Sequence, residues 1–143
     1  MTSVGEIFVV QRHEASRLHF DFRLQVGDVL ASWAVPKGPS LDPREKRLAK
    51  RVEDHALDHA TFEGRIGRRR YGAGTVIVWD TGSYTNLTER DGEPLLMPEA
   101  LAAGHVKVEL SVQKISGGFA LTRTRMTCAD RTWLRDNLPD QVT

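Results

Sequence analysis

The segment Leu18-His-Phe-Asp-Phe-Arg-Leu24 constrains the fold more than any other part of the chain. Its apolar and polar residues alternate strictly, and successive side chains of a β-strand point to opposite faces. The apolar side chains therefore share the face that packs on a core, while His19, Asp21 and Arg23 share the other face. The pattern predicts a half-buried strand that displays an imidazole, a carboxylate and a guanidinium in one row, about 6.5 to 7 Å apart.

Short β-branched or alternating segments indicate several more strands. We expect strands over residues 7–10, 18–26, 29–35, 75–80, 105–112 and 118–125, and either a last strand or a short helical turn over 131–138. Asp42-Pro-Arg-Glu45 offers an N-cap, a proline at the first helical position and a glutamate at the third, which predicts a short helix over 43–51. Residues 98–103, followed by Gly104, form the other candidate helix.

The length of the chain favours a single core. Its 143 residues match the usual size of one domain, and no repeat, low-complexity tract or linker divides them. We expect one domain over residues 1–143 that is mainly β, a compact β-barrel with one or two short helices. No apolar run is long enough to span a membrane and the N-terminus lacks the features of a signal peptide, so a cytoplasmic protein with no membrane partner is expected.

The polar row of the central strand suggests a metal site. His19 and Asp21 can bind the same divalent cation, and His13 could supply a third ligand from the preceding turn. The single cysteine, Cys128, excludes a thiolate zinc cluster, so His, Asp and Glu would have to hold the metal. Arg23 beside such a metal could hold two phosphate oxygens, which favours phosphoryl chemistry. The alternative is that the row is the solvated face of a strand and binds nothing.

Histidines and basic residues gather in the same part of the sequence. Four of the five histidines lie in the first 59 residues, and residues 44–70 carry a net charge of +4 against −4 for residues 80–109. His55 and His59, which stand next to acids, could belong to the site, and Lys37 and Arg47 could add positive charge to it. For each of these residues alone, an ordinary surface side chain is the alternative.

A run of arginines followed by an aromatic residue is a candidate nucleic-acid contact. Such residues can pair with phosphates and stack on a base. The run consists of Arg68, Arg69, Arg70 and Tyr71. The Gly72-Ala-Gly74 turn that follows could cradle a phosphate, but two glycines at this spacing are more typical of a tight turn.

Several motifs together resemble the 3'-phosphoesterase domain of bacterial DNA ligase D and its stand-alone relatives. The longest is Gln11-Arg-His-Glu-Ala-Ser-Arg-Leu-His-Phe-Asp-Phe-Arg-Leu24. The resemblance continues through Ser32-Trp-Ala-Val-Pro-Lys-Gly-Pro-Ser-Leu41, Val52-Glu-Asp-His55, Phe62-Glu-Gly64, Tyr71-Gly-Ala-Gly74, Val76-Ile-Val-Trp-Asp80 and, more loosely, Leu121-Thr-Arg-Thr124 and Trp133-Leu134. It covers nearly the whole chain.

The resemblance implies a function in the healing of DNA 3' ends. A compact β-barrel that binds Mn²⁺ or a similar divalent transition metal would remove a 3'-terminal ribonucleotide and then hydrolyse the remaining 3'-phosphate to a 3'-hydroxyl. This would be a step in break repair by non-homologous end joining, on primer-template ends. A DNA ligase or polymerase and the Ku end-binding protein are implied partners, and a monomer is expected.

The resemblance also implies roles for individual residues. The metal ligands would be His13, His19 and Asp21. The scissile phosphate would contact Arg23 and His55, with Lys37 and Arg47 assisting and with Gln11 and Glu53 behind these groups.

The chain departs from the family pattern at three places. His59 stands where the family usually has a tyrosine, and its imidazole could donate to phosphate in place of the phenol, support other residues or add a metal ligand. Arg68–Arg70 replace a Pro-Glu-Gly sequence. Residues 2–10 contain no arginine or lysine, although some members use an arginine from an N-terminal arm. The hypothesis is that Arg68–Arg70 partly replace that arm.

Two other functions remain open on the sequence. A DNA-end-binding module with an impaired active site would fit the departures at His59 and Arg68–Arg70. A non-haem iron(II) oxygenase would fit the spacing of His19 and Asp21 with a later histidine, although Arg23 beside the metal weighs against it.

Overall fold

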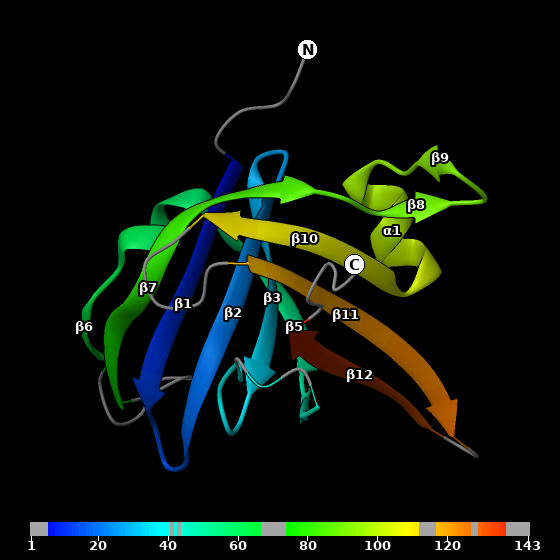
Figure 1. Cartoon of the computed structure of the whole chain (residues 1–143). Coiled ribbons are helices and arrows are strands. Elements are labelled where there is room, and N and C mark those ends of the chain that lie inside the picture. Colours follow the sequence, from blue (N-terminus) through cyan, green and yellow to red (C-terminus); the bar gives the residue numbers. More distant parts are fainter. Residues whose placement is uncertain are drawn as a thin grey trace.

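The computed structural model describes residues 6–40, 42, 44–66, 74–111, 117–126 and 129–136. These residues form antiparallel strands, one α-helix and one 3-10 helix (Figure 1). The strands are β1 (Glu6–Glu14), β2 (Leu18–Val26), β3 (Val29–Val35), β4 (Lys46–Leu48), β5 (Lys50–Ala56), β6 (Gly64–Ile66), β7 (Gly74–Asn86), β8 (Glu89–Arg90), β9 (Glu93–Pro94), β10 (His105–Ser111), β11 (Gly117–Met126) and β12 (Ala129–Asp136). The helices are η1 (Leu57–Thr61) and α1 (Met97–Ala103).

One large sheet dominates the architecture. Its strand order is β4-β12-β11-β10-β7-β1-β2-β3-β5, with β6 paired to β7, and β8 and β9 form a separate hairpin. The predicted mainly β class with a short helix is confirmed, but strand pairing does not close the sheet into a barrel, because its two ends, β4 and β5, do not pair with each other. Only Ala49 separates β4 from β5, so one segment pairs with β12 through its first part and with β3 through its second.

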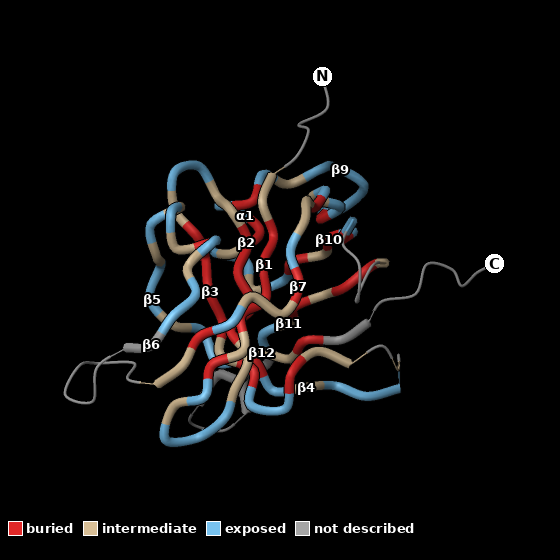
Figure 2. Tube along the Cα trace, turned by 90° about the vertical axis from the view of Figure 1, so that its left-hand side faces the viewer, coloured by how far each residue is buried: buried red, intermediate tan, exposed pale blue. Residues whose placement is uncertain are grey.

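Strand β2 has the bounds and the two faces that its alternation predicts. Phe22 and Leu24 are fully buried in the main hydrophobic cluster, and Phe22 packs edge to face on Phe8 of β1 with ring centroids 4.9 Å apart. The polar face is not solvated, however. Asp21 and Arg23 are only 6% and 3% exposed, and the buried part of β2 runs between those of β1 and β3 in Figure 2.

A second, smaller hydrophobic cluster accounts for this burial. Its fully packed members are Val9 of β1, Leu30 of β3 and Ala60 of η1, with Ile7, Leu57 and Val78 partly buried against them. Because Val9 and Leu30 alternate with residues of the main core, they lie on the opposite face of the sheet. Helix η1 therefore packs against the polar face of β1–β3 and shields part of it from water.

A β-bulge lies beside the same polar face. Val10 pairs with Asp80 while Gln11 pairs with Val78, so Trp79 of β7 is the extra residue. The Trp79 ring packs edge to face on Phe20 of β2, with centroids 5.6 Å apart. Bulges bend a strand and re-aim its side chains, and this bulge falls where β1 carries Gln11 and, two residues later, His13.

The helix predicted over residues 43–51 is wrong. Asp42 Oδ1 accepts the N–H of Arg44 at 2.9 Å, as a helix cap would, yet the chain continues as β4 and β5. β4 pairs with β12, and the N–H of Ala49 donates to the carbonyl of Thr132 at 2.8 Å. Pairing with β12 and β3 satisfies the backbone groups that a short helix would have paired internally, so long-range pairing outweighs a local capping signal.

The second predicted helix is confirmed as α1. The Glu99 carboxylate accepts the N–H of Leu96 at 3.0 Å, and Gly104 ends the helix at a φ of 83°, which glycine adopts without strain. The choice between a strand and a helical turn near residue 131 is resolved in favour of strand β12. Within the described part of the chain, no helix has the length and apolar character needed to cross a membrane.

Gly74 gives a test of how β7 meets the end of β1. It has a φ of +131°, and a Cβ there would clash with the carbonyl oxygen of Glu14 and lie 2.8 Å from Cα of Ala15. We expect Gly74→Ala to lower the free energy of unfolding by about 3 kcal/mol, because strain and a backbone clash add. Urea denaturation measures this change.

Gly92→Ala is the matched control. Gly92 also has a positive φ, +81°, but a Cβ at this position would meet no described atom within 4 Å. This substitution should cost only the strain of the left-handed backbone, about 1 kcal/mol. Equal losses in the two variants would contradict the close approach of β7 to β1.

Candidate active site

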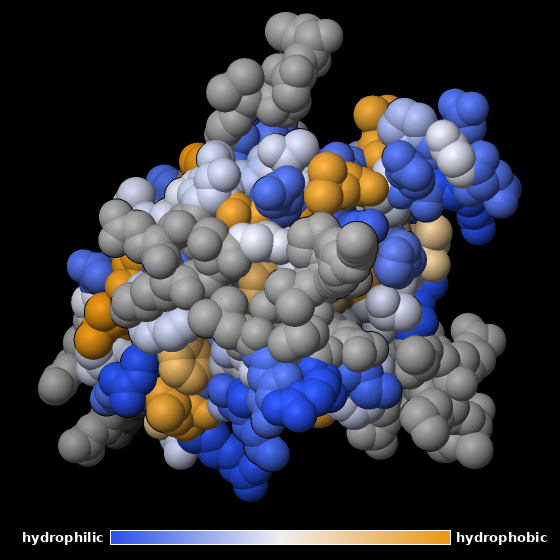
Figure 3. Space-filling view, viewed as in Figure 1, coloured by the Kyte–Doolittle hydropathy of each residue, from blue (hydrophilic) through white to orange (hydrophobic). Residues whose placement is uncertain are grey.

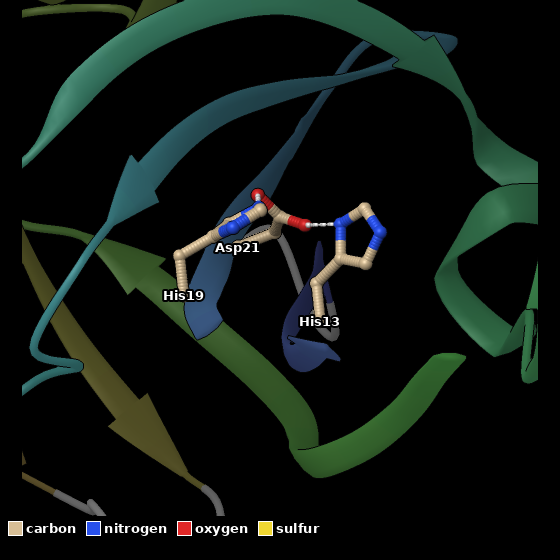
Figure 4. A group of neighbouring side chains, drawn as sticks. All are labelled: His13, His19 and Asp21. Atoms are coloured by element: carbon tan, nitrogen blue, oxygen red, sulfur yellow. Dashed lines mark ion pairs between the residues drawn. The ribbon is translucent and has the colours of Figure 1, made fainter. Parts of the chain in front are cut away.

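His13, His19 and Asp21 meet on the polar face of β1 and β2. One ligand atom from each lies within 4.8 Å of the other two, and Figure 4 shows the Asp21 carboxylate pointing between the two imidazoles. Asp21 Oδ2 lies 3.6 Å from His13 Nδ1, and Asp21 Oδ1 lies 3.3 Å from His19 Nε2. Two imidazole nitrogens and one carboxylate within this span fit a divalent transition metal, with open positions left for other ligands.

Strand register explains why these three side chains converge. His13 of β1 lies directly opposite His19 of β2, and their rings are 4.7 Å apart between centroids. Asp21 lies two residues further along β2 and so shares the face of His19. The predicted third ligand, His13, thus belongs to a strand paired with β2, and the β1–β2 hairpin alone brings the group together.

Arg23 extends this group as a buried charge with several partners. Its Nε donates to Gln11 Oε1 at 2.7 Å and its Nη1 donates to Ser32 Oγ at 2.8 Å. Its Nη2 lies 3.4 Å from Asp21 Oδ2. Ser32 lies on β3 and Gln11 on β1, so the guanidinium ties three neighbouring strands together. A buried guanidinium requires such partners, because an unpaired charge in this position would be strongly unfavourable.

Gln11 connects Arg23 to η1. Its Nε2 donates to the carbonyl oxygens of His59 and Phe62 at 2.8 and 3.0 Å, and its side chain is fully buried. The amide oxygen faces Arg23 and the amide nitrogen faces the end of η1, so both ends of the side chain are used. Gln11 therefore fixes the position of His59 relative to Arg23.

His55 and His59 complete this side of the pocket. Their rings lie 4.7 Å apart between centroids, and the His59 ring stacks on Phe62 at 5.2 Å. His55 Nδ1 lies 3.0 Å from Arg23 Nη1 and 3.1 Å from the carbonyl oxygen of Glu53. It can accept from Arg23 or donate to Glu53, but one nitrogen of a neutral ring cannot do both.

The protonation of His19 and Asp21, which share one face of β2, favours an ion pair. The hydrogen bond to Asp21 raises the pKa of His19, although partial burial opposes this effect. Burial acts to raise the pKa of Asp21, but the hydrogen bond from His19 and the charge of Arg23 outweigh it and hold that pKa below its ordinary value. Asp21 is therefore a carboxylate at neutral pH.

The two later histidines have the opposite tendency. Burial, reinforced by the charge of Arg23, lowers the pKa of His55. Burial, Arg23 and His55 together lower the pKa of His59 from 6.5 to about 4. Both rings are thus neutral near pH 7. If His55 Nδ1 accepts from Arg23, its Nε2 carries the hydrogen and is a donor.

These residues line one cavity of about 530 Å³. Its walls include His13, His19, Asp21, Arg23, Glu53, His55 and His59, all of them candidates from the sequence. Gln11 lies behind Arg23, as described above. Arg68, Arg69, Arg70 and Tyr71 lie outside the described residues.

Lys37 and Arg47 do not line this cavity. Both border a separate hollow near the end of β3, where Arg47 donates to the carbonyl oxygens of Lys37 and Gly38 and pairs with Glu45 at 3.0 Å. The motifs had grouped these two residues with Arg23 and His55, which line the neighbouring cavity instead.

Two residues of the site were missed in the sequence, Lys50 and Ser32. Lys50 lines the cavity because β5 places it opposite Ala34, which in turn lies opposite Asp21. Ser32 lies opposite Arg23 and binds it. The alternation of β3 could have placed Ser32 on the polar face, but Lys50 depends on which strand pairs with β3, and the sequence carries no local signal of that.

Comparisons with known proteins identify the family of the chain. Residues 11–123 match the family model described as the DNA Ligase D 3'-phosphoesterase domain. The chain is 50% identical over 126 residues to the multifunctional non-homologous end joining protein LigD of Pseudomonas aeruginosa, which is 88% of this chain and 14% of that protein.

Mycobacterial relatives are similar over nearly the whole chain. The LigD DNA repair protein of Mycobacterium tuberculosis is 43% identical over 141 residues, 99% of this chain and 17% of that protein. LigD of Mycolicibacterium smegmatis is 39% identical over 140 residues, 98% of this chain and 18% of that protein. The chain thus spans less than a fifth of the length of these multifunctional relatives. On the family match and these identities, the chain belongs to the DNA ligase D 3'-phosphoesterase domain family.

Proposed function

We propose that the chain is a divalent-metal-dependent phosphoesterase that heals DNA 3' ends during break repair by non-homologous end joining. Water first cleaves the bond between phosphorus and the 5'-oxygen of a 3'-terminal ribonucleotide, which releases a ribonucleoside and leaves a 3'-phosphate on the strand. A second hydrolysis then converts this 3'-phosphate to a 3'-hydroxyl and free phosphate. The observation that carries the proposal is the convergence of His13, His19 and Asp21 beside the buried Arg23 in one cavity. Family membership and the names of the relatives support the substrate class and the pathway.

His13, His19 and Asp21 would hold the metal, and Mn²⁺ is the ion we propose. Nitrogen and carboxylate donors in this number suit Mn²⁺ and related transition metals. When bound, such an ion acts as a Lewis acid toward a phosphate and supplies an activated water for hydrolysis.

Arg23 orients the phosphate. Its contacts with Gln11, Ser32, His55 and Asp21 leave one N–H of the Nη2 group for a phosphate oxygen. Because partners on three strands hold the guanidinium, it needs no rearrangement as negative charge develops on the phosphate oxygens. A lysine at this position would lose the planar set of donors that these contacts use.

His55 and His59 act as neutral hydrogen-bond donors to the phosphate. A neutral ring with Nε2–H can donate into the cavity while His55 Nδ1 accepts from Arg23. In this role His59 replaces the tyrosine that the family usually has at its position. Its low pKa keeps it neutral near pH 7.

Lys50 supplies the mobile positive charge of the cavity. Lys50 is exposed and lines the cavity together with Glu53 and His55. A flexible ammonium group can follow a phosphate oxygen as the bond to the leaving group breaks. Lys50 thus takes the place in the cavity that the motifs suggested for Lys37 and Arg47.

The first test removes a proposed metal ligand. His19→Ala and Asp21→Ala should each lower Mn²⁺-dependent release of a 3'-ribonucleoside from a primer-template by at least about a hundredfold. Mutation of residues that only support metal ligands already lowers metal affinity or activity by about 10- to 100-fold, and loss of a ligand should cost more. Gel analysis of a labelled primer measures both steps, since the 3'-phosphate and 3'-hydroxyl products separate. Chelation of the metal should have the same effect on the wild type.

His105→Ala is the matched control, since His105 is exposed on β10 and lies outside the cavity. Full activity of both ligand variants would overturn the assignment. Tight binding to primer ends with no metal-dependent cleavage by the wild type would favour the end-binding module, and product formation that requires oxygen and a 2-oxoacid would favour the oxygenase.

The second test concerns Lys50. Lys50→Gln should lower kcat/KM for the same substrate by about tenfold or more, because a hydrogen bond to a charged group contributes about 1.5–3 kcal/mol. Lys107→Gln, on β10, removes the same charge away from the cavity. If both variants retain wild-type kcat/KM, Lys50 does not contact the phosphate.

The third test follows the charge of His59 in the metal-free protein. NMR titration of the ring should give a midpoint near pH 4, with the signal assigned by its absence in His59→Gln. The unfolded chain takes up a proton near pH 6.5 but the folded protein does not until about pH 4, so His59 contributes to the loss of stability as the pH falls through this window. The His59→Gln variant should therefore lose less stability between pH 7 and pH 5. A midpoint near 6.5 would contradict the neutral donor role.

A further inference from the structure

A second hollow, of about 460 Å³, lies next to the candidate active site. Its walls combine two exposed lysines, Lys37 and Lys46, with apolar surface from Pro36, Leu48 and Trp133. Figure 3 shows hydrophilic side chains gathered at the lower centre of this face, where β3 ends in Figure 1. No step of the proposed hydrolysis uses this hollow.

Strand pairing and side-chain contacts hold the walls of the hollow in place. Leu48 of β4 lies directly opposite Trp133 of β12, so their side chains share a face, and the Lys46 ammonium lies 5.3 Å from the centroid of the Trp133 ring. Arg47 donates to the carbonyl oxygens of Lys37 and Gly38 at 2.6 and 3.1 Å, which ties β4 to the turn after β3.

The charge of the hollow comes from its lysines. Glu45 lies 3.0 Å from Arg47 and balances that guanidinium. Lys37 and Lys46 form no ion pair with the acidic side chains of the described residues within 4 Å. The two lysines therefore give the hollow a net positive charge, and Trp133, with Lys46 over its ring, gives it an aromatic surface.

The hollow continues the active-site cavity along two segments. Ala34 lines the cavity and Pro36 lines the hollow, while Lys50 lines the cavity and Leu48 lines the hollow. In each case the separation is two residues, about 7 Å along an extended chain. Burial alternates across the junction, with Ala49 fully buried between two exposed neighbours, so Leu48 and Lys50 point to the same side. This distance is comparable to the distance between successive phosphates of one extended nucleic-acid strand.

We infer that this hollow binds the nucleotide next to the terminal one, on the strand whose 3' end occupies the cavity, when that end is unpaired from its template. The inference rests on the proposed function. The base stacks on Trp133, and Lys37 and Lys46 pair with the backbone phosphate; stacking on an aromatic ring beside basic residues is how proteins bind single strands without reading their sequence. Lys46 exchanges its contact with the ring for one with the phosphate.

We test nucleotide binding in the hollow by equilibrium binding. The metal-free protein is titrated against a labelled single-stranded oligonucleotide that ends in one 3' ribonucleotide. Trp133→Leu should weaken binding about tenfold, and Lys46→Gln should reduce the slope of log affinity against log salt concentration by about 0.7. Arg90→Gln, in the distant β8–β9 hairpin, removes one exposed positive charge and is the control that should leave affinity within about twofold.

An abasic site locates the stacked base. Placed next to the terminal nucleotide, it should weaken binding to the wild type about tenfold but have little further effect on Trp133→Leu, whereas an abasic site five nucleotides further in should act equally on both. A smaller effect of this abasic site on Trp133→Leu than on the wild type shows a loss of stacking, because a variant that is only less stable would respond equally to both abasic positions. If Trp133→Leu does not fold, the two abasic positions compared on the wild type and on Lys46→Gln still decide the matter.

Two results keep the inference distinct from the proposed function. If the wild type shows metal-dependent cleavage but the two abasic positions have equal effects, the inferred role of the hollow is wrong. The proposed phosphoesterase activity is then unaffected. Absence of cleavage would overturn the phosphoesterase, and the inference that depends on it, even if the base next to the end stacks on Trp133. Support requires cleavage, and also an increase of KM rather than a decrease of kcat in Lys46→Gln, because the hollow binds ground state and transition state alike.

Discussion

The buried guanidinium of Arg23 is the constraint on which the rest of the site depends. A charge that is 3% exposed is tolerated only with partners, and its partners come from β1, β2 and β3: Gln11, Asp21 and Ser32. A slip of one residue in either strand pairing would turn a partner to the other face and leave the charge unpaired. The position of Arg23 and the register of three strands therefore specify each other.

The same network determines what covers the polar face. Gln11 uses its amide oxygen for Arg23 and its amide nitrogen for the carbonyls of His59 and Phe62, about 50 residues later in the chain. The hydrophobic cluster under η1 is small, with three fully packed members, so these hydrogen bonds add directional support that apolar packing alone lacks. Burial by η1 and the charge of Arg23 then lower the pKa values of His55 and His59.

Local patterns in the sequence predicted much of the fold and the part of the site that lies on one hairpin. The alternation of β2 predicts both faces, and the polar row with His13 predicts the group that the structure brings within 4.8 Å. The segment after Asp42 could not be predicted in this way, because its capping signal is satisfied in a turn that leads to β4. Lys50 and the separation of Lys37 from the cavity both follow from how β4 and β5 pair with β12 and β3, which is long-range information.

The near-zero net charge of the chain conceals an uneven distribution of charge. The fold places acidic and basic side chains in different regions of the molecule. Exposed acids of the β8–β9 hairpin and of α1, namely Glu89, Asp91, Glu93 and Glu99, lie at the upper right of Figure 1. The turn after β3, which carries Lys37, lies at the lower centre. An anionic strand is repelled by the first region and attracted by the second, so the field of a chain with a formal charge of +1 still orients the approach of a polyanion. Because screening acts within about 10 Å at moderate salt, this steering affects the rate of encounter, whereas in the proposed function the contacts within the cavity decide which phosphate is held.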